Sequence, residues 1–301
     1  MPAVTGDDTS RAVLDKAARE NFPVAPVFLP RAWRRDLMAV YGFARLVDDI
    51  GDGDLADGGR PDAVRLGLDP AAAGDRIAML DAFEADLLRV FDGSAGAPSH
   101  PLLLALRPTV ERHRLTPDPF LGLIAANRQD QQVSRYQSYD DLLAYCELSA
   151  NPVGRLVLSI TGTSTPERVR RSDAICTALQ IVEHLQDVAE DLGRDRIYLP
   201  AQDMKAHSVD EADLAAPSAG AAVRALIAFE AERARDLLDE GAPLVGSVRG
   251  RLRLLLTGFV AGGRAALKAV ESAGYDVLAG PPKATKPGLL REVGSTLRRE
   301  G

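Results

Sequence analysis

Residues 167–192 read ERVRRSDAICTALQIVEHLQDVAEDL, a long run without a proline or a glycine. Apolar side chains recur in it at steps of three and four residues, which is the period of an α-helix and not of a strand. Gly193 follows at once and predicts the C-terminal end of the helix. The stretch therefore predicts an unusually long helix and an all-α fold.

The rest of the chain has the same period. A helix is expected from Pro30 to the cluster Gly51-Asp52-Gly53, and Ser138 is a plausible N-cap. Further helices are predicted at 77–91, 101–115, 216–240 and 247–273, with loops at 53–71 and 92–101. Because no repeat and no Pro/Ser-rich linker divides the chain, we expect one helical domain at 11–288, a flexible N-terminus at 1–10 and a C-terminal tail at 289–301.

Composition excludes several classes of protein. The chain has 301 residues, is 46% hydrophobic and carries a net charge of −7, which argues against disorder and against a nucleic-acid binder. Cys146 and Cys176 are too few for a disulfide framework, so a reducing cytoplasm is the expected location. No apolar run reaches the ~18 residues of a membrane span. The sequence shows no strongly basic amphipathic helix, and peripheral contact with the inner membrane face stays open.

Two clusters of acidic residues lie at the C-terminal ends of predicted helices. Asp48 and Asp52 are four residues apart, which places them on one helical face about 5–6 Å apart. Glu183, Asp187 and Asp191 continue the same spacing in the long helix. Carboxylates repel one another and the negative end of a helix, whereas a divalent cation such as Mg²⁺ would reverse both penalties. The alternative for each cluster is a solvated helix face.

Two signatures resemble the squalene and phytoene synthase family, from about residue 11 to Gly288. The first comprises 20–25 (ENFPVA), 29–31 (LPR), 41–45 (YGFAR) and 48–52 (DDIGD), and the second comprises 178–180 (ALQ), 186–191 (QDVAED) and 194–200 (RDRIYLP). The resemblance implies an isoprenoid-synthase fold, a single helical bundle in which two Asp-rich helices face a central cavity. It also implies that Mg²⁺ ions bind a prenyl diphosphate there.

Four segments are most similar to the bacterial hydroxysqualene synthase branch of hopanoid biosynthesis: 20–23 (ENFP), 127–136 (NRQDQQVSRY), 149–155 (SANPVGR) and 274–278 (GYDVL). This branch implies conversion of presqualene diphosphate and water to hydroxysqualene and diphosphate. The sequence departs from the family at Glu183, where an Asn is usual, and at Glu147, where phytoene-type members carry Tyr. It also has Gln186 where some relatives have a basic residue.

The residues that match the signatures are candidates for the site. The expected catalytic residues and Mg²⁺ ligands are Asp48, Asp52, Asp187 and Asp191, with Glu183 as a further ligand. The expected substrate-binding residues are Phe22, Tyr41, Arg45, Asp130, Arg135, Asn151 and Gln180. Most have a structural alternative, and Asp130 could instead be a helix-surface partner for Arg128 or Ser134. Arg45 could form a salt bridge with Asp48 or Asp49, Asn151 could cap a helix, and Phe22 more plausibly closes an apolar pocket.

Two other functions remain open. One is a head-to-head prenyl synthase that makes presqualene diphosphate, squalene or phytoene. The other is a catalytically silent helical protein that binds lipid or assembles enzymes of squalene and hopanoid synthesis. Both aspartate pairs are intact, which counts against a silent protein.

Overall fold

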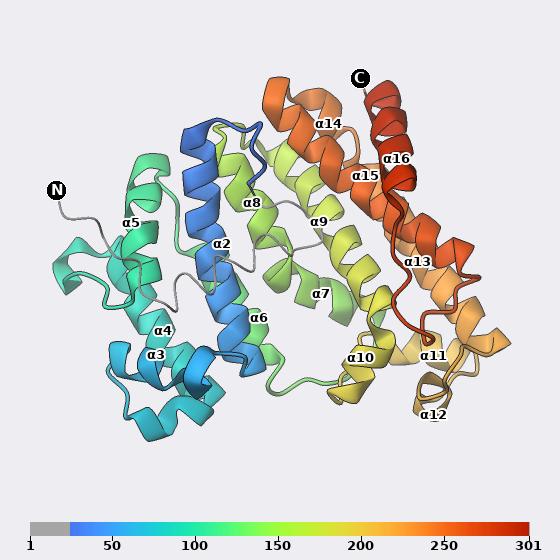
Figure 1. Ribbon diagram of the computed structural model, residues 1–301, viewed down its shortest axis with the longest axis horizontal. Coiled ribbons are helices and arrows are strands. Elements are labelled where there is room, and N and C mark those ends of the chain that lie inside the picture. Colours follow the sequence, from blue (N-terminus) through green and yellow to red (C-terminus); the bar gives the residue numbers. More distant parts are fainter. Residues whose placement is uncertain (1–24, 301) are drawn as a thin grey trace. The chain divides into compact units, whose positions relative to one another are not determined.

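The computed structural model describes residues 25–300, and regular structure in that range is helical (Figure 1). One isolated bridge, between Arg135 and Ile197, is the sole β-type pairing in this range. The prediction of an all-α fold is therefore confirmed. None of the described helices is long and apolar enough to cross a bilayer.

The helices follow one another closely along the chain. They are α2 (Arg31–Asp52), α3 (Arg60–Arg65), α4 (Arg76–Phe91), α5 (Pro101–His113), α6 (Asp118–Gln129), α7 (Tyr139–Ser149), α8 (Asn151–Ile160), α9 (Pro166–Gln186), α10 (Val188–Gly193), α11 (Ala201–Ala206), α12 (Glu211–Leu214), α13 (Ala221–Gly241), α14 (Leu244–Ser247), α15 (Gly250–Ser272) and α16 (Lys286–Arg299). Short 3-10 helices lie at Ala56–Gly59, Pro70–Gly74 and Gly93–Ala95.

The chain divides into two compact units, which are described separately. Unit 1 is Met1–Gln132 with Leu156–Thr163, and unit 2 is Val133–Arg155 with Ser164–Gly301. The first acidic cluster belongs to unit 1 and the second belongs to unit 2.

Unit 1 is built around α2, which packs against α4, α5 and α6. Three fully buried aromatic rings join these helices: Phe43 stacks on Phe83 with centroids 5.5 Å apart and meets the edge of Phe120 at 5.1 Å. Burial of such rings contributes about 1.5–3 kcal/mol each relative to exposure. This packing turns one side of α2 to the core. It therefore also sets the direction of the side chains on the rest of the helix.

The end of α2 is set by Gly53. This residue has φ 78°, a left-handed conformation that glycine adopts without a steric penalty, and its N–H bonds to the carbonyls of Asp49 and Ile50. The helix therefore persists through Asp52, which the sequence had left open.

Unit 2 is organised by α9, which runs along α13, with α15 packed on both. The backbones of α9 and α13 approach closely at Gly241. A Cβ at this position would lie 2.6 Å from the carbonyl oxygen of Arg171 and 3.0 Å from the backbone nitrogen of Ile175. Glycine is required there because backbone atoms cannot give way as a side chain can.

Two sequence expectations about local structure were wrong. The segment 53–71, expected as a loop, contains α3, the whole 3-10 helix Ala56–Gly59 and the start of the 3-10 helix Pro70–Gly74. The long helix of 167–192 is interrupted at Asp187, whose φ of −105° and ψ of 13° separate α9 from α10. No Pro or Gly marks the interruption, so periodicity alone could not find it. The end at Gly193 is confirmed, and so is the N-cap at Ser138, which forms a capping box with Asp141.

Candidate active site

The first acidic cluster lies at the end of α2 in unit 1. Asp48 accepts a hydrogen bond of 3.2 Å from the side-chain amide of Asn127 on α6. Desolvation raises the pKa of Asp48 to about 7, and the charges of Asp52 and Asp49 add to it, whereas Asn127 and Arg45 oppose it. Solvent nevertheless reaches the Asp48 side chain. The carboxylate is therefore accessible, yet its negative charge is poorly compensated.

Asn127 reaches Asp48 because Gly51 has no side chain. A Cβ on Gly51 would lie 2.1 Å from the side-chain oxygen of Asn127. The carbonyl of Gly51 accepts hydrogen bonds from Arg76 at 3.1 Å and from Gln131 at 3.0 Å. This carbonyl in the last turn of α2 is thus satisfied by side chains, and the Arg76 cation offsets the negative helix end.

The other candidates on α2 lie on the same stretch of helix. Arg45 forms an ion pair with buried Asp49, with 2.9 Å from Nε and 2.8 Å from Nη2 to Oδ1. This is one of the salt bridges that the sequence left open. Tyr41 is half-buried one turn earlier, and Asp52 is half-buried as the last residue of the helix.

The second acidic cluster surrounds the break between α9 and α10 in unit 2. Asp187 itself forms the junction, and its N–H still bonds to the carbonyl of Glu183 at 3.0 Å. Desolvation raises the pKa of Asp187, and the charges of Asp191 and Glu190 raise it further, while His184 and Lys283 oppose them. As in unit 1, a partly desolvated aspartate is surrounded by more acid than base.

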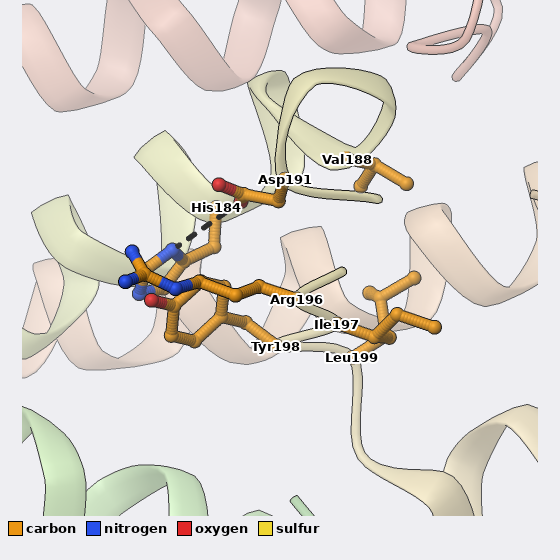
Figure 2. A pocket seen from close by; sticks show the side chains of 7 residues that line it. All are labelled: His184, Val188, Asp191, Arg196, Ile197, Tyr198 and Leu199. Atoms are coloured by element: carbon orange, nitrogen blue, oxygen red, sulfur yellow. Dashed lines mark ion pairs between the residues drawn. The ribbon is translucent and has the colours of Figure 1, made fainter. Parts of the chain in front are cut away.

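A small pocket in unit 2 is lined by His184, Val188 and Asp191, with Arg196 and the following residues (Figure 2). Its volume is about 10 Å³, enough for about one water molecule. The His184 ring stacks on Tyr198 with centroids 3.6 Å apart, and its Nδ1 lies 3.9 Å from Oδ2 of Asp191. The Arg196 side chain extends across the same pocket in Figure 2. His184 therefore lies close to a candidate ligand.

The remaining candidate residues near this cluster differ in their surroundings. Glu183 is exposed, and Gln180 lies 3.1 Å from Nε2 of His184 through its side-chain nitrogen. Gln186 donates a hydrogen bond to the carbonyl of Pro282, next to Lys283. The segment before α16 thus brings a lysine close enough to influence the pKa of Asp187.

Asn151 and Arg135 are engaged with protein groups. Asn151 starts α8, is buried, donates to Glu147 at 2.8 Å and accepts from Thr177 at 3.0 Å. Arg135 forms ion pairs of 2.8 Å with both Asp195 and Glu211, at the edge of a cavity of about 480 Å³. Its positive charge is therefore compensated by two carboxylates.

Two candidates remain, Asp130 and Phe22. Asp130 is half-buried and caps the C-terminal end of α6. Its suggested partner Arg128 instead forms ion pairs with Asp81 and Glu84. Phe22, with the whole motif 20–23, lies outside the described residues.

The donor set suits a hard divalent cation. Each cluster offers carboxylate oxygens. Desolvation, with help from neighbouring carboxylates, raises the pKa of Asp48 and Asp187, and a bound divalent cation would offset that penalty. Within residues 25–300, no three His, Cys, Asp or Glu side chains are grouped as a metal site. Mg²⁺ commonly takes only one or two carboxylates and completes its coordination with substrate phosphates and water.

Sequence reasoning missed three residues at these clusters: Asn127, Arg76 and His184. Asn127 lay within a segment quoted for its resemblance, but no periodicity links it to Asp48, 79 residues away. Arg76 had no signal at all, because its partner is a backbone carbonyl. His184 is three residues from Asp187 and seven from Asp191, so its position in the sequence was a usable signal.

Comparisons with known proteins agree with the resemblance. A sequence profile of the squalene/phytoene synthase family matches residues 15–288. Hydroxysqualene synthases of Rhodopseudomonas palustris and Zymomonas mobilis are 32% and 33% identical to the chain, over 76% and 77% of it and 72% of each relative. A 15-cis-phytoene synthase of Synechococcus elongatus is 28% identical, over 86% of this chain and 82% of that one.

Two solved structures are similar over nearly the whole chain. Squalene synthase HpnC from Alicyclobacillus acidocaldarius is 41% identical, with a TM-score of 0.76 over 91% of this chain and 94% of that one. A dehydrosqualene synthase in complex with ligand is 22% identical, with a TM-score of 0.80 over 97% and 96%. These similarities confirm the expected isoprenoid-synthase fold and the expectation of an enzyme. The chain therefore belongs to the squalene/phytoene synthase family.

Proposed function

We propose that this enzyme converts presqualene diphosphate and water to hydroxysqualene and diphosphate in a Mg²⁺-dependent reaction. The observation that carries the proposal is the pair of under-compensated carboxylate clusters, each at the end of a helix. The hydroxysqualene synthases among the relatives, each about a third identical to the chain, support the choice of reaction.

The proposed roles follow from charge. Asp48, Asp52, Asp187 and Asp191, with Glu183, would hold Mg²⁺, which when bound neutralises the diphosphate leaving group. Asn127 orients the Asp48 carboxylate through its hydrogen bond. The guanidinium of Arg45, which is paired with Asp49 at the end of α2, would add positive charge next to the diphosphate.

The reaction balances without a reductant. The carbon–oxygen bond to diphosphate breaks, and its electron pair leaves with the diphosphate. The oxygen of water then bonds to the carbocation and loses one proton to solvent. The protein's part is to bind the charged diphosphate. The attraction between two unit charges about 4 Å apart, at an effective dielectric constant of about 20, is about 4 kcal/mol before desolvation.

Product analysis tests this reaction. The enzyme is incubated with presqualene diphosphate and Mg²⁺ in oxygen-labelled water, with and without a nicotinamide reductant, and the products are identified by mass spectrometry. We expect labelled hydroxysqualene in both reactions. Squalene formed only with reductant, or no product, would contradict the proposed reaction.

A second candidate is head-to-head condensation, favoured by the 28% identical phytoene synthase among the relatives. Farnesyl diphosphate or geranylgeranyl diphosphate supplied alone distinguishes it, because condensation yields presqualene diphosphate or phytoene and hydration yields neither. A catalytically silent protein is tested by Mg²⁺-dependent release of diphosphate from either class of substrate, which such a protein would not perform.

A further inference from the structure

A further group of charged side chains in unit 2 joins α11 to α13 and belongs to neither acidic cluster. Glu230 of α13 is 1% exposed, and Asp203 of α11 is buried as well. Arg233, one turn after Glu230, donates through the same nitrogen, Nη1, to Oδ2 of Asp203 at 2.7 Å and to Oε1 of Glu230 at 3.3 Å. One guanidinium therefore lies between two buried carboxyl groups.

Aromatic rings from two helices contact this guanidinium. The central carbon of the Arg233 guanidinium lies 4.2 Å from the ring centre of Tyr139, the first residue of α7, and 4.3 Å from that of Phe229 on α13. Both contacts favour a cation over the face of a ring. The position of Arg233 is therefore fixed by groups from α7, α11 and α13.

The charges in this group do not balance. If both acids ionise, two carboxylates and one guanidinium leave a net charge of −1, and two carboxyl groups at one site commonly keep a proton between them. Burial raises the pKa of Glu230 to about 7, the charge of Arg233 opposes the rise, and the charge of Asp203 and a hydrogen bond with it add to the rise. The helices α9 and α15 also pack on α13, but neither supplies one of the charges that act most strongly on Glu230.

Other titratable groups lie nearby on α7, α11 and α13. Tyr139 and Cys146 stay neutral, because burial raises the pKa of each to about 12. Asp236 adds negative charge next to Tyr139. His207, the C-cap of α11, donates through Nδ1 to the carbonyl of Asp203 at 2.9 Å. Because a histidine can also gain a proton between pH 5 and 8, its effect must be separated from that of the glutamate by experiment.

We propose that Glu230 and Asp203 share one proton, and that release of this proton to solvent weakens the attachment of α11 to α13. With the proton in place, the Glu230 carboxyl donates to Asp203, and Arg233 compensates the remaining negative charge. Without it, two buried carboxylates repel each other across one guanidinium. Met204 and Lys205 of α11 line the cavity of about 480 Å³ described above, so opening of α11 would change the wall of that cavity. The proposal does not depend on the proposed reaction.

Hydrogen exchange of the full-length protein at pH 5 and pH 8 tests the proposal, with rates corrected for the intrinsic pH dependence of amide exchange. The pKa of Glu230 is about 7 in the folded chain against 4.5 normally, so its stabilising effect is full below about pH 4.5 and is lost as the pH rises through 7. We expect the amides of residues 205–209 to open about tenfold more often at pH 8, as for a proton held one pKa unit more tightly in the closed form. Equal opening at the two pH values would overturn the proposal.

Substitution of Glu230 identifies the group that titrates. Glu230→Gln should abolish the pH dependence, because an amide can donate to Asp203 and accept from Arg233 as the protonated carboxyl does, but has no proton to release in this range. The matched control is Glu232→Gln on the same helix, which breaks an exposed pair with Arg235 and should keep the tenfold change. A native pH dependence in Glu230→Gln would overturn the proposal.

Two further variants keep the test decisive if Glu230→Gln does not fold. Asp203→Asn removes the like charge that faces Glu230 and should also flatten the pH dependence, whereas His207→Gln should retain it. The opposite pattern, a flat profile in His207→Gln and a native one in Asp203→Asn, would assign the change to the histidine and overturn the proposal.

Discussion

The two acidic clusters share a four-residue spacing but differ in their backbones. At the first, α2 continues unbroken through Asp52, and Arg76 and Gln131 satisfy the carbonyl of Gly51. At the second, the helix is interrupted at Asp187, and the partners of the cluster come from a loop and a stacked histidine. The same four-residue spacing therefore occurs once on a regular helix, whose last turn is hydrogen-bonded by side chains from outside the helix. It occurs a second time across a break between two helices.

The largest expected effect is loss of turnover when either cluster loses its charge. Asp48→Asn and Asp187→Asn should each lower kcat by about a hundredfold or more, because a neutral amide binds Mg²⁺ poorly. Mg²⁺-dependent diphosphate release measures the loss. If one variant kept native activity, the two clusters would not be equivalent and the ligand assignment at that one would be withdrawn.

The next effect tests the contact between Asn127 and Asp48, which supports the first cluster only. Gly51→Ala should displace Asn127 from Asp48 and lower activity about tenfold to a hundredfold, the usual cost of losing the partner of a metal ligand. Gly193→Ala at the end of α10 is the matched control, because no atom lies within 4 Å of its added Cβ. Asn127→Ala should reproduce the Gly51→Ala loss. A loss of equal size in Gly193→Ala would show that the effect is not specific to the first cluster.

A smaller effect is expected from the loop beside the second cluster. Lys283→Met removes a cation whose charge lowers the pKa of Asp187. We expect the KM for the diphosphate substrate to rise about threefold with kcat little changed, as for one solvent-accessible charge. Lys268→Met, which breaks an exposed pair with Glu271 on α15, is the control and should leave KM unchanged.

The smallest effect is on stability without Mg²⁺. The pKa of Asp48 is about 7 in the folded chain against 3.8 normally, so its contribution to folding is full below about pH 4 and is lost as the pH rises through 7. Asp48→Asn should therefore unfold at a higher temperature than the native protein at pH 8, and by less at pH 5. Because solvent reaches this side chain, we expect about 1 kcal/mol, or a few degrees. Thermal melting at the two pH values measures it, and a lower melting temperature at pH 8 would contradict the sign.

The sequence was sufficient for the regular parts of the molecule. Helical periodicity with Gly53 and Gly193 predicted where α2 and α10 end, and Ser138 was correctly predicted as an N-cap. It was insufficient where a tertiary contact decides the geometry. The break at Asp187 contains no helix-breaking residue, and the contact of Asn127 with Asp48 joins two helices far apart in the chain.

The charge of the C-terminal helix shows a further limit. The sequence analysis found no strongly basic amphipathic helix and expected a C-terminal tail at 289–301. The structure gives a helix over Lys286–Arg299, and only that periodicity places Lys286 beside Leu290. Side-chain neighbours on a helix cannot be assigned until the helix itself is identified.

The close approach of α9 and α13 at Gly241 has a consequence for hydrogen exchange. Contact between backbone atoms holds α9 in a single position, whereas the six residues of α10 follow a junction and have no comparable neighbour at Gly193. Amide protons of α9 should therefore exchange only on opening of the whole unit, and those of α10 through local fraying. The acidic residues of the second cluster would then lie at the junction between the stable helix α9 and the more easily opened helix α10. Ion binding there can rearrange α10 without displacing α9.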